Sequence, residues 1–322
     1  MADLIRIAQV EELGQDPVLR RAAAPVAGAG QVLVRMRAAA LNFADLLKAQ
    51  GSYQEPSDPP FVPGLEGAGE VIAAPGDSGL TPGDRVAVLA PGTMAEIVAV
   101  PAAGCLPIPG AMDFAQAAGF QIAYGTGHLA LDFRAALQPG ETLAVLGAAG
   151  GVGLTAVEIG HAMGARVIGV ARGAQRLARV REAGADEVID SETCADLKSA
   201  LRDLGGVDVV YDPVGDSAGE AAFAALRRGG RFLVIGFAGG RQPVLPLNHA
   251  LVKNIAIHGF YWGGYHQLDP AALRRSMARL FALFEAGRLA PVAGHGLPLE
   301  RIAEGYGLLR DRKAVGKVVI SL

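Results

Sequence analysis

The stretch TLAVLGAAGGVGLTAVEIG, residues 142–160, decides the fold of this chain. It runs from an apolar strand through a glycine-rich turn into the start of a helix, which is the context of a dinucleotide-binding fingerprint. The spacing is Ala148-x-Gly150-x-x-Gly153, with alanine in the first glycine position. Gly150 would let the backbone approach a pyrophosphate, and Gly153 would let the helix pack against the strand. The alternative is a tight strand-to-helix turn that holds no ligand.

The residues expected to contact the cofactor at this turn lie at or next to the helix N-terminus. A helix N-terminus offers free N–H groups and the positive end of the helix dipole to phosphates. The expected contacts are Ala149, Gly150, Gly151, Val152 and Gly153.

The end of the next apolar strand, ARVIGVAR at residues 165–172, indicates which dinucleotide is bound. Sites for NAD place an acidic residue about 20 residues after the glycine turn, where it binds the ribose 2′-hydroxyl. Here that position holds Ala171, followed by Arg172, with Arg176 one turn later. Arginine presents a planar fork of donors to phosphate oxygens, so the sequence predicts NADPH as the cofactor. The alternative is that both arginines are solvated at a helix start.

Strands alternate with helix-length segments from about Tyr124 onward, which predicts a doubly wound α/β domain with a parallel sheet. The expected strands are residues 142–147, 165–171, 186–190, 207–212, 230–236 and 254–260. The segment before Tyr124 has many short strands punctuated by glycine and proline, a pattern that suits a small barrel or sandwich. An amphipathic helix is expected over 269–287, and a final strand over 316–322 that returns to the first domain.

Composition excludes several classes of protein. The chain has 322 residues, which favours two domains, and its net charge is −3 without a block rich in lysine or arginine. Nucleic acid and membranes are therefore not expected as partners. The N-terminus lacks a basic-then-apolar layout, and Cys105 and Cys194 are too few for a disulfide framework. A cytoplasmic protein is expected.

Seven motifs in this order give the chain a resemblance to a known family. They are LNFADLLKAQGSY (41–53), PFVPGLEGAGEV (60–71), GDRV (83–86), AAGGVG (148–153), VDVVYDPVG (207–215), GRFLVIGFAGG (230–240) and GKVV (316–319). Their order resembles the medium-chain dehydrogenase/reductase superfamily, in its zinc-free quinone oxidoreductase branch, essentially from end to end. The resemblance implies an α/β protein in which a doubly wound Rossmann domain is inserted into a β-rich, GroES-like catalytic domain. The catalytic domain would comprise residues 1–123 and 264–322, and the NADPH-binding domain residues 124–263.

Zinc alcohol dehydrogenases of the same superfamily are the rival interpretation. Their catalytic zinc needs a cysteine near the position of Asn42 and a histidine at that of Leu65, and neither residue is present here. Their structural zinc needs four closely spaced cysteines, whereas Cys105 stands alone in this half of the chain. The six histidines show no metal-binding spacing. No metal is expected.

By resemblance, the catalytic candidates are Asn42, near the nicotinamide and the acceptor, and Tyr53, lining the acceptor pocket. An amide at Asn42 can donate to a carbonyl oxygen that gains charge. Asn42 equally fits the N-cap of the helix that follows, and Tyr53 also fits a core aromatic with a solvated hydroxyl. The further cofactor contacts implied by resemblance are Asn42, Thr126, Gly236, Phe237, Tyr261, Trp262 and Lys317. Two departures, Ser191 and Asp216, replace a tyrosine and a glycine that are common in relatives.

The expected activity is a zinc-independent, NADPH-dependent reduction of a quinone or an α,β-unsaturated carbonyl. A pocket without a metal suits an acceptor that needs little Lewis-acid help. An enoyl-thioester reductase and an NADPH-binding protein with vestigial activity stay open as alternatives. A homodimer is also expected, because the segment VLPLNHALVKNIAIHGF (244–260) would otherwise leave an apolar strand exposed at the sheet edge.

Overall fold

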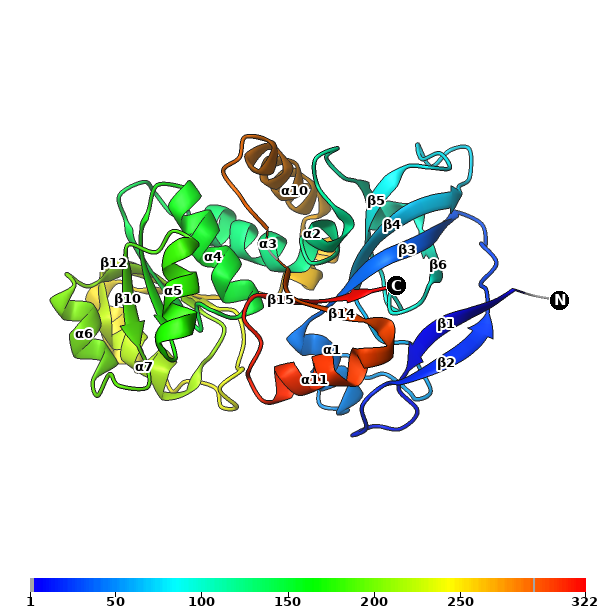
Figure 1. Cartoon of the computed structure of the whole chain (residues 1–322). Helices are drawn as coiled ribbons and strands as arrows, with labels where there is room; N and C mark the ends of the chain where they lie inside the picture. Colours follow the sequence, from blue (N-terminus) through cyan, green and yellow to red (C-terminus); the bar gives the residue numbers. More distant parts are fainter. Residues whose placement is uncertain (1–2, 292) are drawn as a thin grey trace. The chain divides into compact units, whose positions relative to one another are not determined.

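The computed structural model describes residues 3–291 and 293–322 (Figure 1). The chain forms two compact units. The first comprises Met1–Ile122 and Pro291–Leu322, and the second is the continuous segment Ala123–Ala290. The N-terminal and C-terminal segments thus share one unit, as a domain insertion requires.

The first unit is built on antiparallel strands. Its elements are β1 (Leu4–Gln9), β2 (Val18–Ala23), β3 (Gln31–Leu41), α1 (Phe43–Ala49), β4 (Glu66–Ala73), β5 (Arg85–Leu89), β6 (Ile97–Pro101), η1 (Ala102–Gly104), β7 (Cys105–Pro107), α2 (Phe114–Ala118), β14 (Ala293–Pro298), η4 (Leu299–Arg301), α11 (Ile302–Arg310) and β15 (Lys317–Ser321). The main sheet has the order β14-β15-β3-β4-β5-β7, β6 also pairs with β3, and β1 pairs with β2. The last strand, red in Figure 1, therefore returns to the first unit, where β15 runs antiparallel to β3.

Strand β3 shows why this sequence forms a half-buried sheet. Val32, Val34 and Met36 are buried on one face, whereas Arg35 and Arg37 are exposed on the other. This alternation follows the two-residue period of a strand. The buried side chains join those of β5 and β6 in one hydrophobic core.

The second unit carries the parallel sheet. Its elements are α3 (Gln121–His128, which begins in the first unit), the π-helix η2 (Leu129–Arg134), β8 (Thr142–Leu146), α4 (Gly151–Ala162), β9 (Arg166–Ala171), α5 (Ala174–Glu182), β10 (Glu187–Asp190), α6 (Leu197–Asp203), β11 (Val207–Asp212), α7 (Asp216–Ala225), β12 (Leu226–Val234), α8 (Leu247–Lys253), β13 (Ala256–Gly259), η3 (Trp262–Gly264), α9 (Tyr265–Leu268) and α10 (Pro270–Glu285). The strand order is β10-β9-β8-β11-β12-β13, and every pair is parallel. This is the doubly wound order, with its reversal between β8 and β11. The predicted fold class is confirmed.

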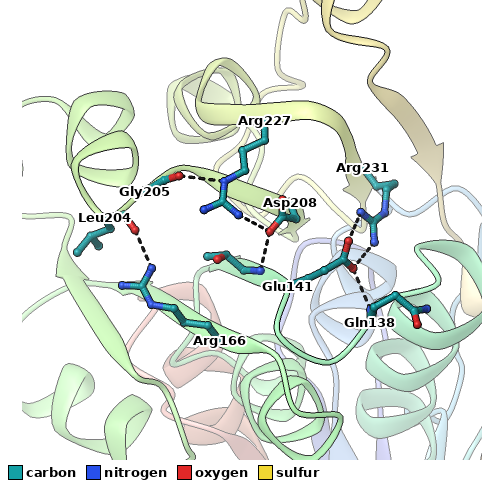
Figure 2. A network of polar contacts seen from close by, with 9 residues as sticks. Gln138, Glu141, Arg166, Leu204, Gly205, Asp208, Arg227 and Arg231 are labelled. Carbon is teal, nitrogen blue, oxygen red and sulfur yellow. Dashed lines mark hydrogen bonds and ion pairs between the residues drawn. The ribbon is translucent and has the colours of Figure 1, made fainter.

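Charged residues at the amino ends of the parallel strands bond to one another (Figure 2). Asp208 Oδ2 accepts from the Thr142 main-chain N–H at 2.8 Å and from Arg227 Nη1 at 2.6 Å. Arg231 donates to both carboxylate oxygens of Glu141, at 2.8 and 2.5 Å, which keeps the pKa of Glu141 below its usual value. These charges tie strand starts together, so we assign them to the stability of the sheet.

Helix α10 belongs to a different unit from the one expected. It was expected to belong with the catalytic domain from residue 264 on, whereas the second unit continues to Ala290. The helix buries Leu273, Met277 and Leu280, and Ser276 Oγ lies 3.0 Å from His128 Nδ1 at the end of α3. Helix α10 thus contacts α3 within the second unit. No helix among the described residues is long and apolar enough to cross a membrane.

Candidate functional site

The glycine turn joins β8 to α4 and is closed by its own backbone. Gly147 has φ = +57°, a left-handed value that glycine adopts readily. The Gly150 N–H donates to the Gly147 carbonyl at 2.9 Å. A β-carbon on Gly153 would lie 2.2 Å from the same carbonyl oxygen. The close approach of helix to turn therefore requires glycine at 153, as the spacing predicted.

The start of α4 fits a phosphate group. A β-carbon on Gly150 would meet one atom within 4 Å, the Gly147 carbonyl oxygen at 3.3 Å, so the backbone here is open to a ligand. Gly151, Val152 and Gly153 form the first turn of α4, where N–H groups lack intrahelical acceptors and face the positive end of the dipole. A methyl group at position 150 would project into this open space.

The loops after β11 and β12 lie beside this turn. A β-carbon on Gly147 would be 2.9 Å from Val214 Cγ2, after β11. The Gly236 N–H donates to the Asp212 carbonyl at 3.2 Å, which brings the loop carrying Phe237 alongside. The glycine turn after β8 and the loop after β11 flank the point at which the sheet order reverses, and ligands of doubly wound sheets bind at that crevice. The structure thus brings the expected contacts Gly150, Gly236 and their neighbours to one edge of the sheet.

Asp212 closes the loop after β11 rather than facing a ligand. Its Oδ1 accepts from the N–H groups of Val214 and Gly215, both at 2.8 Å. Burial raises the pKa of Asp212, although these two hydrogen bonds act in the opposite direction. The carboxylate therefore holds the loop shape.

Thr126 and Trp262, two further expected contacts, come close through Gly125. Thr126 lies buried on α3, and a β-carbon on Gly125 would be 2.6 Å from Trp262 Nε1. That indole nitrogen is buried and has no hydrogen-bond partner among the described residues. Buried donors in native proteins are normally satisfied, so the Trp262 N–H is suited to a ligand. Tyr261, just before it, is exposed.

The end of β9 lies where the sequence placed it. Ala171 is the last residue of β9 and is buried, Arg172 is exposed, and Arg176 lies half-buried in the first turn of α5. The neighbouring acid is Asp190, whose Oδ1 accepts from the N–H groups of Gly173 and Glu192, both at 3.0 Å. These bonds hold the pKa of Asp190 below its usual value. Position 171 itself is alanine and carries no charge, and the carboxylate of Asp190 is occupied by backbone N–H groups.

In the first unit, Asn42 and Lys317 meet at a buried carboxylate. Asn42 Nδ2 donates to Glu66 Oε1 at 3.0 Å. Lys317 Nζ donates to Asn42 Oδ1 at 2.7 Å and to Glu66 Oε1 at 2.8 Å. All three side chains are buried. Lys317 was expected to contact the cofactor, and the structure gives it two partners within the first unit.

Glu66 is the residue of this cluster that sequence reasoning missed. Its side chain is fully buried at the start of β4, and its Oε2 accepts from the Ile122 N–H at 2.9 Å. A signal was present, because Glu66 is a charged residue in a segment whose neighbours are apolar or glycine. A buried charge requires a partner, and Lys317, 251 residues away, supplies it.

Asp45 holds the start of α1. Its Oδ2 accepts from the Asn42 N–H at 2.8 Å, and its Oδ1 accepts from the Gly64 N–H at 3.1 Å. Burial raises the pKa of Asp45 to about 6, although both hydrogen bonds and the charge of Lys317 lower it. Asn42 does occupy the N-cap position of this helix, while its amide also bonds to Glu66 and Lys317.

Tyr53 lies in the loop after α1. The ammonium group of Lys48 is 5.2 Å from the centroid of its ring, which is within the range of a cation–π contact. The ring is half-buried.

Within the described ranges 3–291 and 293–322, no group of three or more histidine, cysteine or acidic residues is arranged to hold a metal ion.

Two family models match the chain. Residues 28–110 match the alcohol dehydrogenase GroES-like domain, and residues 151–279 match the domain described as zinc-binding dehydrogenase. The quinone oxidoreductase-like protein 2 homolog of Nematostella vectensis is 37% identical over 301 residues, which cover 91% of this chain and 82% of that protein. The chain belongs to the quinone oxidoreductase branch of the medium-chain dehydrogenase/reductase superfamily. The family expected from the motifs is therefore confirmed.

Solved structures of quinone oxidoreductases and related proteins share the whole fold. The quinone oxidoreductase from Thermus thermophilus, solved alone and in complex with NADPH, is 32% identical, with a TM-score of 0.88 over 98% of this chain and 100% of that chain. A probable oxidoreductase from Mycobacterium abscessus is 35% identical, with a TM-score of 0.91 over 100% of both chains. The order of units and strands seen here is thus that of the quinone oxidoreductase family.

Proposed function

We propose that this chain is an NADPH-dependent reductase that transfers hydride to a quinone or an α,β-unsaturated carbonyl without a metal ion. The observation that carries the proposal is the glycine cradle at the reversal of the parallel sheet, where a β-carbon on Gly153 would lie 2.2 Å from the Gly147 oxygen. Membership of the quinone oxidoreductase branch supports the reaction class. The NADPH complex of the Thermus thermophilus relative supports the cofactor.

The second unit would hold the cofactor through groups already described. NADPH supplies the hydride when it is bound. The N–H groups at 149–153 would face its pyrophosphate, and Arg172 and Arg176 its 2′-phosphate. Thr126 and the N–H of Trp262 would be further polar contacts from the same unit, with Gly236, Phe237 and Tyr261 as packing contacts.

The first unit would act on the acceptor. Asn42, with Lys317 bonded to its carbonyl, offers an amide N–H to an oxygen that gains charge, and Tyr53 would line the acceptor pocket. Leu65 cannot bind a metal, and Cys105 is the one cysteine before residue 194. The acceptor must therefore be electrophilic by itself, as quinones, enones and enoyl thioesters are.

The test follows NADPH oxidation by enzyme dialysed against a strong chelator, with a panel of quinones, enones and enoyl thioesters. We expect turnover with at least one quinone or enone and no dependence on added zinc. Activity that is lost on chelation and restored by zinc would refute the metal-free reaction. NADPH binding without turnover of any acceptor would favour the alternative of a vestigial enzyme, and turnover of thioesters alone the enoyl-thioester reductase.

Cofactor preference is a further prediction. Because position 171 is uncharged and two guanidinium groups follow it, we expect NADPH to bind at least ~10-fold more tightly than NADH, about 1.4 kcal/mol. Arg176→Ala should weaken NADPH and leave NADH nearly unchanged. Arg181→Ala, on the exposed side of the same helix, is the matched control and should change neither. Equal dissociation constants for the two cofactors in a fluorescence titration would contradict the prediction.

We also propose a homodimer. Strand β13 is an edge of the parallel sheet, and the apolar side chains of Val244, Leu247, Leu251 and Val252 beside it are exposed. Unpaired edges tend to pair with another chain. Light scattering at micromolar concentration should give twice the 33.0 kDa of one chain. Leu251→Glu should lower that mass, and Val26→Glu, at a position that is also exposed but lies in the first unit, should not. A wild-type monomer would contradict the dimer.

A further inference from the structure

The side-chain amide of Asn42 lies between a group that only accepts hydrogen bonds and a group that only donates them. Its Nδ2 is 3.0 Å from a carboxylate oxygen of Glu66, and its Oδ1 is 2.7 Å from the ammonium nitrogen of Lys317. An ionised carboxylate has no proton to give, and an ammonium has no lone pair. Rotating the amide by 180° would set oxygen against oxygen and N–H against N–H. The chemistry of the two neighbours therefore fixes the orientation of the amide.

Both neighbours are themselves held in place. The carboxylate of Glu66 is fully buried, and its second oxygen accepts from the Ile122 N–H at 2.9 Å. Lys317 is buried on β15, and Gly119, at the end of α2, lies beside its stem. A β-carbon on Gly119 would lie 3.1 Å from Lys317 Cε. Lys317 and Glu66 also bond to each other at 2.8 Å, so neither charge is left uncompensated.

The hydrogen-bond capacity of the amide then identifies the atom left for a ligand. A carboxamide has two N–H donors and two lone pairs on its oxygen. One N–H of Asn42 goes to Glu66, and one lone pair accepts from Lys317. The second N–H is the remaining donor of this side chain, and its direction is set because the amide is planar.

We propose that Glu66 and Lys317 are positioning residues that hold the Asn42 amide in one orientation, so that its second N–H faces the carbonyl oxygen of a bound ligand. The inference rests on the proposed function, in which Asn42 acts on a carbonyl. It goes further by giving roles to a carboxylate and an ammonium group that no motif assigned to the acceptor. The opposing interpretation is an ion pair that only stabilises the first unit.

A double-mutant cycle tests the positioning role. In Glu66→Gln, one amide nitrogen replaces an oxygen, so at least one of the three donors from Asn42, Lys317 and Ile122 faces another donor. We expect kcat to fall ~10- to 100-fold, within the range for a lost positioning contact, with the dissociation constant of NADPH unchanged within about twofold. In an Asn42→Ala background, the same change should have little further effect on kcat, because the residue it orients is gone. Effects that multiply would overturn the proposal.

A matched control separates positioning from stability. Thr93 is equally buried and donates to the main-chain carbonyl of Glu66 at 3.0 Å, not to its carboxylate. Thr93→Val should lower the unfolding midpoint and leave kcat unchanged. A loss of kcat in this variant as large as that in Glu66→Gln would assign the effect to stability. Lys317→Arg, which keeps a positive donor, should retain more activity than Lys317→Met, and equal losses in the two would count against positioning.

An NMR measurement gives a result that does not depend on turnover or on a folded Glu66 variant. The two side-chain amide protons of Asn42, assigned by their absence in Asn42→Ala, should exchange with water at different rates in the wild-type enzyme. The proton bonded to Glu66 should exchange slowly and the other faster. Fast exchange of both protons, as in an exposed asparagine, would overturn the fixed orientation, even if activity follows the proposed function. A fixed amide in a protein without turnover would instead reject the proposed function and leave the orientation standing.

Discussion

Replacing Gly153 by alanine is expected to lower the free energy of unfolding by about 2 kcal/mol and to weaken NADPH binding at least ~100-fold, about 2.7 kcal/mol. The added β-carbon would lie 2.2 Å from the Gly147 oxygen, 2.9 Å from the Gly147 carbonyl carbon and 3.0 Å from the Ala148 α-carbon. All three are backbone atoms, so no side chain can turn aside. The turn itself must move away from α4, and the N–H groups that face the phosphates move with it.

Two further alanine variants separate the loss of stability from the loss of NADPH binding. In Gly150→Ala the nearest atom is 3.3 Å away, so we expect near-normal stability with weakened NADPH binding, because the new methyl group fills the cradle. Gly307→Ala lies in α11, has no atom within 4 Å of the new carbon and serves as the control for alanine in a helix. Thermal unfolding and NADPH titration of the three variants check the prediction. Normal NADPH affinity in both Gly150→Ala and Gly153→Ala would exclude the glycine turn as the phosphate site.

The second unit could be predicted from the sequence because its signals are local. The apolar strand, the glycine turn and the helix start lie within residues 142–160, and each is decided by neighbours a few positions away. The five later strands repeat the same rhythm, and the parallel order of β8 to β13 follows from it. Ala171 and Arg172 were likewise placed by counting from the turn to the end of β9.

The buried cluster of the first unit could not be assembled in this way. Lys317 is 275 residues from Asn42 and 251 from Glu66, and no spacing rule joins residues so far apart. The pairing of β15 with β3, which matches Val318 with Leu41, brings Lys317 next to Asn42. The sequence indicated that a final strand returns, but not the register that gives the lysine its partners.

The expected domain boundary at residue 264 shows a different limit of prediction from sequence. An amphipathic pattern shows that α10 has an apolar face, and it does not say which surface covers that face. The structure supplies the partner, since Ser276 and His128 lie 3.0 Å apart within the second unit. Resemblance of motifs could not resolve this point, because no motif lies in the helix.

Replacing Asn42 by alanine is expected to slow the reaction by roughly 10- to 1000-fold, the range for losing one preorganised donor or a positioning contact. The variant removes the amide and leaves Lys317 and Glu66 bonded to each other at 2.8 Å. The ion pair therefore persists, and the first unit should fold. Steady-state kinetics with the best quinone or enone, beside a titration of NADPH, measure the effect on kcat separately from that on cofactor affinity.

The same position must be tested for its structural role, because Asn42 is also the N-cap of α1. Loss of an N-cap costs about 0.5–2 kcal/mol of stability, so Asn42→Ala lowers both stability and rate if both roles hold. Asn42→Ser separates them, since serine is a good N-cap and is too short to replace an amide bonded to both Glu66 and Lys317. A serine variant with wild-type stability and slow turnover would assign the amide to the reaction. Full activity in the serine variant would reduce Asn42 to a helix cap, and the acceptor oxygen would then need a donor from another residue.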